Sequence, residues 1–167
     1  MSGMPEAHGR MTVVTEREGV LLIGGALDET SGLLDLIGRA ADHKLVLDLA
    51  GVTFINSLGV RDWIRMQAAA TKAGVHVEML KVSEPVVHQL NMIVATRGTG
   101  SVSSFYAPYA CDACGREESR LIDAVANAAA LRRMEAPPMV CPECSQPMAF
   151  NDFPERFFSF LSPEPRG

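Results

Sequence analysis

The first half of the chain switches repeatedly between two hydrophobic periodicities. Residues 11–16 and 20–26 are predicted to form two strands, which are separated by a turn at Glu18-Gly19. Residues 28–31 are acidic and hydroxyl-rich, as at the start of a helix, and an apolar stripe at helical spacing follows them. The stripe consists of Leu33, Leu34, Ile37, Ala40 and Ala41.

The same alternation continues through the next segments. Residues 44–49 (KLVLDL) form a short, nearly continuous apolar run, which predicts a strand buried on both faces. Residues 59–72 predict a helix that ends at Gly74, and residues 75–79 predict a further strand. Ser83 is expected to cap a third helix. The apolar faces of the two helices are expected to contain Val60, Trp63, Ile64 and Ala68, and Val86, Leu90 and Ile93, respectively.

This order of elements predicts an α/β fold with a mixed β-sheet flanked by helices. We expect a flexible N-terminus at residues 1–9 and a first domain at residues 10–97. The polar, glycine-containing segment 96–101 (TRGTGS) is the expected linker. Residues 102–162 then form a second, smaller domain, which is richer in proline and aromatic residues and contains all the cysteines.

The four cysteines form two Cys-x-x-Cys pairs, Cys111/Cys114 and Cys141/Cys144. Two intervening residues allow both thiolates of a tight turn to reach one ion, and Gly115 supplies the positive backbone dihedral that such a turn often needs. Two turns provide the tetrahedral four-sulfur shell that structural zinc prefers. The pattern therefore predicts one structural zinc ion. Free buried thiols, two disulfides or a redox pair are the alternatives, and disulfides fit poorly with the absence of a secretion signal.

The second domain has little apolar material for a core of its own. Metal binding contributes on the order of 10 kcal/mol to the folding of such small domains, so the cysteines are expected to act as scaffold. The aromatic segment 153–160 is expected to cover the metal-binding unit or to dock on the first domain.

The segment 51–60 is expected to be a loop between the buried strand and the second helix. Asn56 and Ser57 are both suitable N-caps for that helix. Asp48 lies in the apolar strand, and the loop amides are its nearest candidate hydrogen-bond donors if it is buried.

The sequence LVLDLAGVTFINSLGV, from Leu45 to Val60, resembles the signature of STAS domains, the bacterial anti-anti-sigma factor family. The similarity covers roughly residues 10–95 and includes KAGVHV from Lys72 and VSEPVVHQL from Val82. It implies a mixed sheet flanked by helices and a role in protein–protein signalling. A partner kinase or anti-sigma factor would dock on the loop and helix containing Asp48, Asn56, Ser57, Leu58, Gly59 and Val60.

Two residues depart from the family pattern. Asn56 stands where the family has Asp, and Leu58 stands at the phosphoacceptor position without a hydroxyl group. Ser57 matches the serine before the usual acceptor. The resemblance therefore implies a docking surface without the usual phosphorylation switch, and Leu58 makes that surface apolar. The similarity of residues 102–162 to zinc ribbons is confined to the cysteine pairs.

Composition and charge argue against several classes of function. The net charge is −5 and lysine ends at Lys81, so no basic patch for nucleic acid is evident. No apolar run approaches the roughly 20 residues of a membrane-spanning helix, and residues 1–10 do not resemble a secretory signal, so a cytoplasmic location without membrane insertion is expected. Neither a phosphate-binding glycine loop nor a nucleophile–histidine pairing was recognised in the sequence.

Taken together, the sequence predicts a non-enzymatic regulatory adaptor with a structural zinc ribbon. The expected partner is a protein, either a kinase-like anti-sigma factor, an ATPase subunit or a second copy of the chain. One alternative is a nucleic-acid-binding zinc ribbon regulated by the first domain, and another is a thiol-redox enzyme.

Overall fold

A five-stranded sheet forms the first half of the molecule, which we describe from a computed structural model covering residues 12–162. The expected flexible residues 1–9 lie outside this range. The strands are β1 (Thr12–Arg17), β2 (Val20–Leu27), β3 (Lys44–Ile55), β4 (His76–Leu80) and β5 (Ser101–Val102), and they lie in the order β1-β2-β3-β4-β5. β1 is antiparallel to β2, and the other neighbours are parallel.

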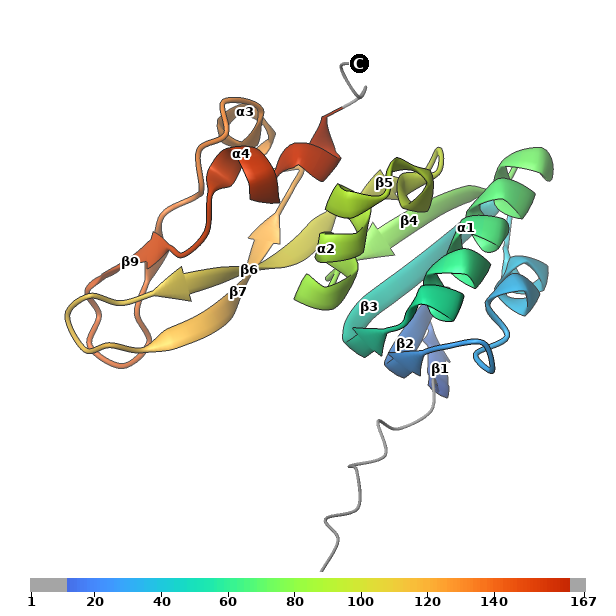
Figure 1. Ribbon diagram of the computed structural model, residues 1–167, viewed down its shortest axis with the longest axis horizontal. Coiled ribbons are helices and arrows are strands. Elements are labelled where there is room, and N and C mark those ends of the chain that lie inside the picture. Colours follow the sequence, from blue (N-terminus) through green and yellow to red (C-terminus); the bar gives the residue numbers. More distant parts are fainter. Residues whose placement is uncertain (1–11, 163–167) are drawn as a thin grey trace, which may run out of the picture.

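Three helices connect the parallel strands. They are the 3-10 helix η1 (Leu33–Arg39), α1 (Ser57–Lys72) and α2 (Glu84–Met92), followed by the 3-10 helix η2 (Val94–Arg97). All three crossovers advance in the same direction along the sheet, so right-handed connections place η1, α1 and α2 on one face (Figure 1). Leu45, Leu47 and Leu49 point into the core on that side. The predicted mixed α/β architecture is confirmed.

β3 differs from its prediction in length and in burial. The expected loop 51–60 is wrong over residues 51–55, because these residues continue the ladder to β2, with Gly51 opposite Gly24 and Ile55 opposite Leu27. A Cβ at Gly51 would lie 3.0 Å from the Gly24 Cα atom, so glycine allows this close pairing. Burial on both faces is also wrong, since helices cover one face and Val46 on the other face is only half-buried.

The first expected helix is a 3-10 helix rather than an α-helix. Its N-cap position is Gly32 in a left-handed conformation (φ 66°), and no side chain caps it. The acidic segment before it instead folds on itself, because the Thr30 amide donates to the Asp28 carboxylate (2.8 Å). Leu33 and Leu36 are its buried residues.

The two longer helices follow their predictions with local corrections. Gly74 follows the last residues of α1 with φ 69°, as expected of a helix end. The face of α1 that is buried includes Met66 and Ala70, whereas the expected Ala68 is exposed. Ser83 occupies the N-cap of α2 without a capping hydrogen bond, because the amides of Val86 and Val87 bond to the Ser83 carbonyl instead. Ile93 follows α2 and is partly exposed.

The expected linker 96–101 is an ordered part of the first half. Thr96 is 1% exposed, and its carbonyl accepts hydrogen bonds from Trp63 Nε1 (2.8 Å) and Gln67 Nε2 (3.3 Å) of α1. Ser101 already belongs to β5. The domain limits 10–97 and 102–162 stay a prediction, although the segment between them is fixed in place.

A second, antiparallel sheet forms the other half. Its strands are β6 (Ser104–Ala110), β7 (Glu117–Asp123), β8 (Met139–Val140) and β9 (Pro147–Phe150), in the order β7-β6-β9-β8. Three short helices complete it: α3 (Ala128–Arg132), α4 (Pro154–Phe157) and the 3-10 helix η3 (Ser159–Leu161). One residue, Ser103, separates β5 from β6, and Val82 forms a parallel bridge with Phe105. The chain therefore passes from the first sheet into the second with a single residue between them.

The C-terminal aromatic segment joins the two halves. Phe157, Phe158 and Phe160 are buried, and all three rings contact Phe105 of β6. Asn91 of α2 donates to the Phe157 carbonyl (2.9 Å) and accepts from the Phe160 amide (2.8 Å). Figure 1 shows α4 beside the second sheet and the short red helix that follows it next to α2. The predicted docking on the first domain is confirmed for this segment, except at Phe153, which is 71% exposed.

None of the helices in residues 12–162 has both the length and the apolar character that crossing a membrane requires.

Gly59 provides a direct test of how α1 sits on β2. A Cβ at this position would lie 2.2 Å from the Leu27 carbonyl oxygen, which is backbone and cannot give way cheaply. We expect Gly59→Ala to lower the free energy of unfolding by about 1–3 kcal/mol, despite the better helix propensity of alanine. Urea denaturation measures the change. The matched control is Gly38→Ala, where a Cβ would meet nothing within 4 Å, and equal effects of the two substitutions would contradict the close packing.

Candidate functional site

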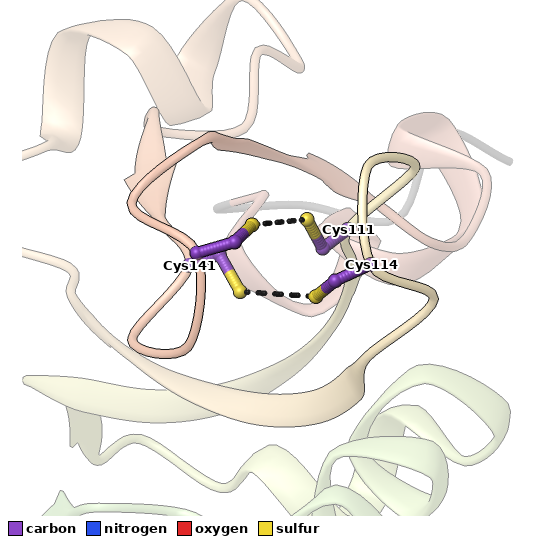
Figure 2. Close-up of side chains that lie close together, drawn as sticks. Cys111, Cys114 and Cys141 are labelled. Atoms are coloured by element: carbon purple, nitrogen blue, oxygen red, sulfur yellow. Dashed lines mark hydrogen bonds between the residues drawn. The ribbon is translucent and has the colours of Figure 1, made fainter.

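The cysteines lie at the tips of two β-hairpins. Cys111 and Cys114 follow β6 in the turn to β7, and Cys141 and Cys144 follow β8 in the turn to β9. The four sulfur atoms all lie within 4.8 Å of one another. Figure 2 shows Cys111 and Cys114 facing Cys141 across the gap between the two turns. The structure thus brings together all four predicted ligands.

The two turns have the same backbone geometry. The Gly115 amide donates to the Cys111 carbonyl (2.8 Å), and the Ser145 amide donates to the Cys141 carbonyl (2.9 Å). Both residues have positive φ, 77° for Gly115 and 61° for Ser145. The second turn therefore holds a serine in the conformation for which the first uses glycine. The two turns thus have matching geometry, and each places its pair of sulfur atoms on one side of the cluster.

The sulfur separations distinguish between the chemical alternatives. The Sγ atoms of Cys111 and Cys144 are 3.4 Å apart, and those of Cys114 and Cys141 are 3.7 Å apart. A disulfide needs about 2.05 Å, and all four cysteines are free. Four sulfurs at about 2.3 Å from a tetrahedral ion would be about 3.8 Å from one another. The cluster therefore fits a four-sulfur metal site and leaves no ligand position open to a substrate.

The pKa values show how strongly the thiol groups affect one another. The Cys144 amide, above all, lowers the pKa of Cys141 to about 7, so this thiol ionises most readily. The Gln146 amide acts in the same direction on Cys144, but the neighbouring Cys111 thiol, burial and the other thiols raise the pKa of Cys144 to about 12. One thiolate thus suppresses ionisation of its neighbours, and a cation at the centre would allow all four to ionise.

Arginines around the cluster are paired with acids. Arg116 contacts Glu118 (3.0 Å) and reaches Glu143 in the opposite turn (2.8 Å). Arg120 also contacts Glu118 (2.9 Å). Exposed pairs of this kind contribute at most about 1 kcal/mol each, so they assist the sulfur cluster only slightly.

The predicted docking residues at the start of α1 differ in their roles: one caps the helix, two are buried and two are exposed. Asn56 is the N-cap of α1, where its side-chain oxygen accepts from the Gly59 amide (2.7 Å). Gly59 and Val60 are buried. Ser57 is exposed and Leu58 is 39% exposed. Ser57 and Leu58 are thus the predicted residues that a partner can reach, and the cap belongs to Asn56 rather than Ser57.

Asp48 lies apart from this helix start. It pairs with Leu80 in the sheet, and its ladder partner on β2, Leu22, is five residues before the partner of Ile55, a separation of about 16 Å along the strand. The buried carboxylate accepts from the Ala50 amide (3.0 Å) and lies 3.8 Å from Lys81 Nζ. The donor is therefore an amide within β3 itself rather than one of the expected amides of residues 51–60, and Asp48 does not share a surface with Leu58.

A comparison of the chain with protein-family models gave no match, and a comparison with curated proteins found no matching sequence.

Some relevant residues were not singled out from the sequence. Phe54 is 41% exposed at the end of β3, next to the start of α1, and strand alternation up to Ile55 would have placed it on the surface. Ser145 gave no sequence signal for its positive φ, because only its equivalence to Gly115 identifies it. Arg97 was assigned to the linker, and its environment depends on tertiary contacts.

The sulfur cluster predicts bound metal in the purified protein. We expect about one metal ion per chain by elemental analysis, because one closed four-sulfur shell holds one ion. Cys114→Ser should reduce the retained metal severalfold, because it removes one ligand. Asp112→Ser, in the same turn, is the matched control and should retain the metal. Metal-free wild-type protein with four reduced thiols would refute the site.

Acid should release the metal. Binding requires four thiolates, and the pKa of Cys144 and that of Cys114 are raised without an ion, so protons compete with the metal as the pH falls. A colorimetric chelator at a fixed low concentration should therefore report metal release that increases steadily on lowering the pH from neutral. Metal release that does not change with pH would contradict thiolate ligation.

Proposed function

We propose that this protein is a non-enzymatic regulatory adaptor that binds a partner protein through the start of α1. Its second half is a zinc ribbon in which the metal is structural. The proposal combines the resemblance of residues 10–95 to STAS domains with the geometry of the helix start and the sulfur cluster.

The observation that carries the proposal is the exposed apolar pair at the start of α1. Phe54 and Leu58 are 41% and 39% exposed, and they lie at the end of β3 and in the first turn of α1. Ser57 lies between them in the sequence and is exposed. An apolar centre with a polar rim is typical of protein-binding surfaces. The Asn56 cap and the packing of Gly59 on β2 fix the position of this surface.

The resemblance to anti-anti-sigma factors supports the same location. In that family the partner docks on the corresponding loop and helix. Leu58 has no hydroxyl group to phosphorylate, so we propose that binding here is constitutive or is controlled on the partner's side. The proposed partner is a kinase-like anti-sigma factor or an ATPase subunit, and self-association is the remaining option.

Zinc is the proposed occupant of the sulfur cluster. Four thiolates in tetrahedral reach are the ligand set of structural zinc, and soft sulfur ligands disfavour magnesium, calcium and manganese. Residues Cys111, Cys114, Cys141 and Cys144 would hold the ion. When bound, zinc would tie the two hairpin tips together and supply stability that the small second sheet lacks.

Substitution of Leu58 tests the docking surface. We expect Leu58→Asp to reduce partner recovery at least about tenfold, because a charge replaces an apolar anchor. The fold should persist, since an acidic residue in the first turn of a helix is favourable. The measurement is quantitative mass spectrometry of proteins that co-purify with wild type and variant from the cells in which the protein is naturally made.

Leu34→Asp is the matched control. Leu34 is a similarly exposed leucine (46%) on η1, outside the proposed surface, so its substitution should leave partner recovery unchanged. Equal recovery with Leu58→Asp and wild type would place docking elsewhere. Equal loss with both variants would also contradict a specific role for the start of α1.

A further inference from the structure

A cavity of about 330 Å³ lies where the C-terminal segment meets the first sheet. Its apolar wall comes from both halves: Met79 of β4, Leu90 of α2, Val102 of β5 and Phe160 of η3. Its polar wall runs from the end of η2 to the start of β5 and contains Arg97, Gly98, Gly100 and Ser101. This volume falls in the range of small-molecule sites, about 300–1,000 Å³. Neither the sulfur cluster nor the start of α1 contributes to its lining.

Arg97 is the one charged residue among the described residues that line this cavity. Its Nε atom donates to the Leu90 carbonyl (2.7 Å), which fixes the direction of the side chain. None of the ion pairs found among residues 12–162 includes Arg97. The guanidinium therefore has its two terminal NH₂ groups available, in the planar arrangement that matches a carboxylate or phosphate.

The backbone that forms the polar wall is held in place by contacts with α1 and β4. Trp63 and Gln67 both donate to the Thr96 carbonyl, immediately before Arg97. A Cβ at Gly100 would lie 2.2 Å from the Val77 carbonyl oxygen, so glycine lets this segment pass directly against β4. Because these contacts hold the backbone on both sides of Arg97, a ligand would meet the guanidinium in a fixed position.

We propose that this cavity binds a small organic anion with a short apolar chain, whose carboxylate or phosphate head pairs with Arg97. The apolar chain lies against Met79, Leu90 and Phe160. Arg97 has no ion-pair partner within residues 12–162 and lies beside apolar walls, which selects this class, because a purely apolar ligand would leave the guanidinium partly desolvated without a partner. A ligand at this place contacts both halves, so its binding also strengthens the docking of η3 on the first sheet.

Hexanoate and hexyl phosphate are the probes, and 1-hexanol and inorganic phosphate are the references. Titrations of the full chain by calorimetry or by NMR give the four dissociation constants. We expect at least one hexyl anion to bind about tenfold or more tightly than 1-hexanol, as one charge-assisted hydrogen-bonding pair allows. Inorganic phosphate should bind more weakly than hexyl phosphate. Hexanoate and hexyl phosphate together identify which headgroup Arg97 prefers.

Two variants test the two walls separately. Arg97→Gln should raise the dissociation constant of the hexyl anion about tenfold while changing that of 1-hexanol less than twofold. Val94→Trp places a large side chain at a lining position that is 47% exposed, and it should weaken both ligands. Val125→Trp is the matched control, because Val125 is an exposed valine that lines a neighbouring cavity and not this one.

Two results would overturn the proposal. One is that 1-hexanol binds as tightly as hexanoate and hexyl phosphate, and the other is that Arg97→Gln leaves the affinity for these two anions unchanged. Equal dissociation constants for inorganic phosphate and hexyl phosphate would show that the hexyl chain does not contact the apolar wall, which would also overturn the proposal. Each result is independent of the Leu58 experiment, so this inference and the proposed adaptor function stand or fall separately.

Discussion

Four thiol groups within 4.8 Å of one another are the constraint on which the second half depends. Ionising one of them makes ionisation of its neighbours harder, as the opposite pKa shifts of Cys141 and Cys144 show. A cation between the sulfurs would offset the repulsion between thiolates, because each thiolate would then be attracted to the cation. Because the sulfurs come from two hairpins, an ion at the cluster would join two hairpins that share few backbone hydrogen bonds with each other. β6 and β9, for example, pair only through Tyr109 with Phe150 and Ala110 with Ala149.

Away from the sulfur cluster, ordinary hydrophobic packing takes over. β6 leads from Ala110, beside Cys111, to Phe105, whose ring meets Phe157, Phe158 and Phe160. Asn91 then fixes the backbone of that aromatic segment to α2. The cysteine end and the α/β end are therefore linked by one strand and one returning segment.

The features with functional potential lie at three separate places. The sulfur cluster is at the tip of the second sheet, the exposed Leu58 is at the start of α1, and the Arg97 cavity is where the halves meet. This separation fits a protein that combines a stable scaffold with independent contact sites.

The sequence by itself determined the elements and the ligands. Apolar runs, strand alternation and helical spacing located β2, β4, α1 and α2, and the two Cys-x-x-Cys pairs identified the sulfur cluster, because these signals depend on residues close together in the chain. Tertiary structure decided the rest. β3 extends to Ile55 only because β2 lies alongside it, and Thr96 is ordered only because Trp63 and Gln67 reach its carbonyl. The Arg97 cavity exists because Phe160, more than sixty residues later, closes it. Contacts between distant segments leave no local period in the sequence, so only the folded chain reveals them.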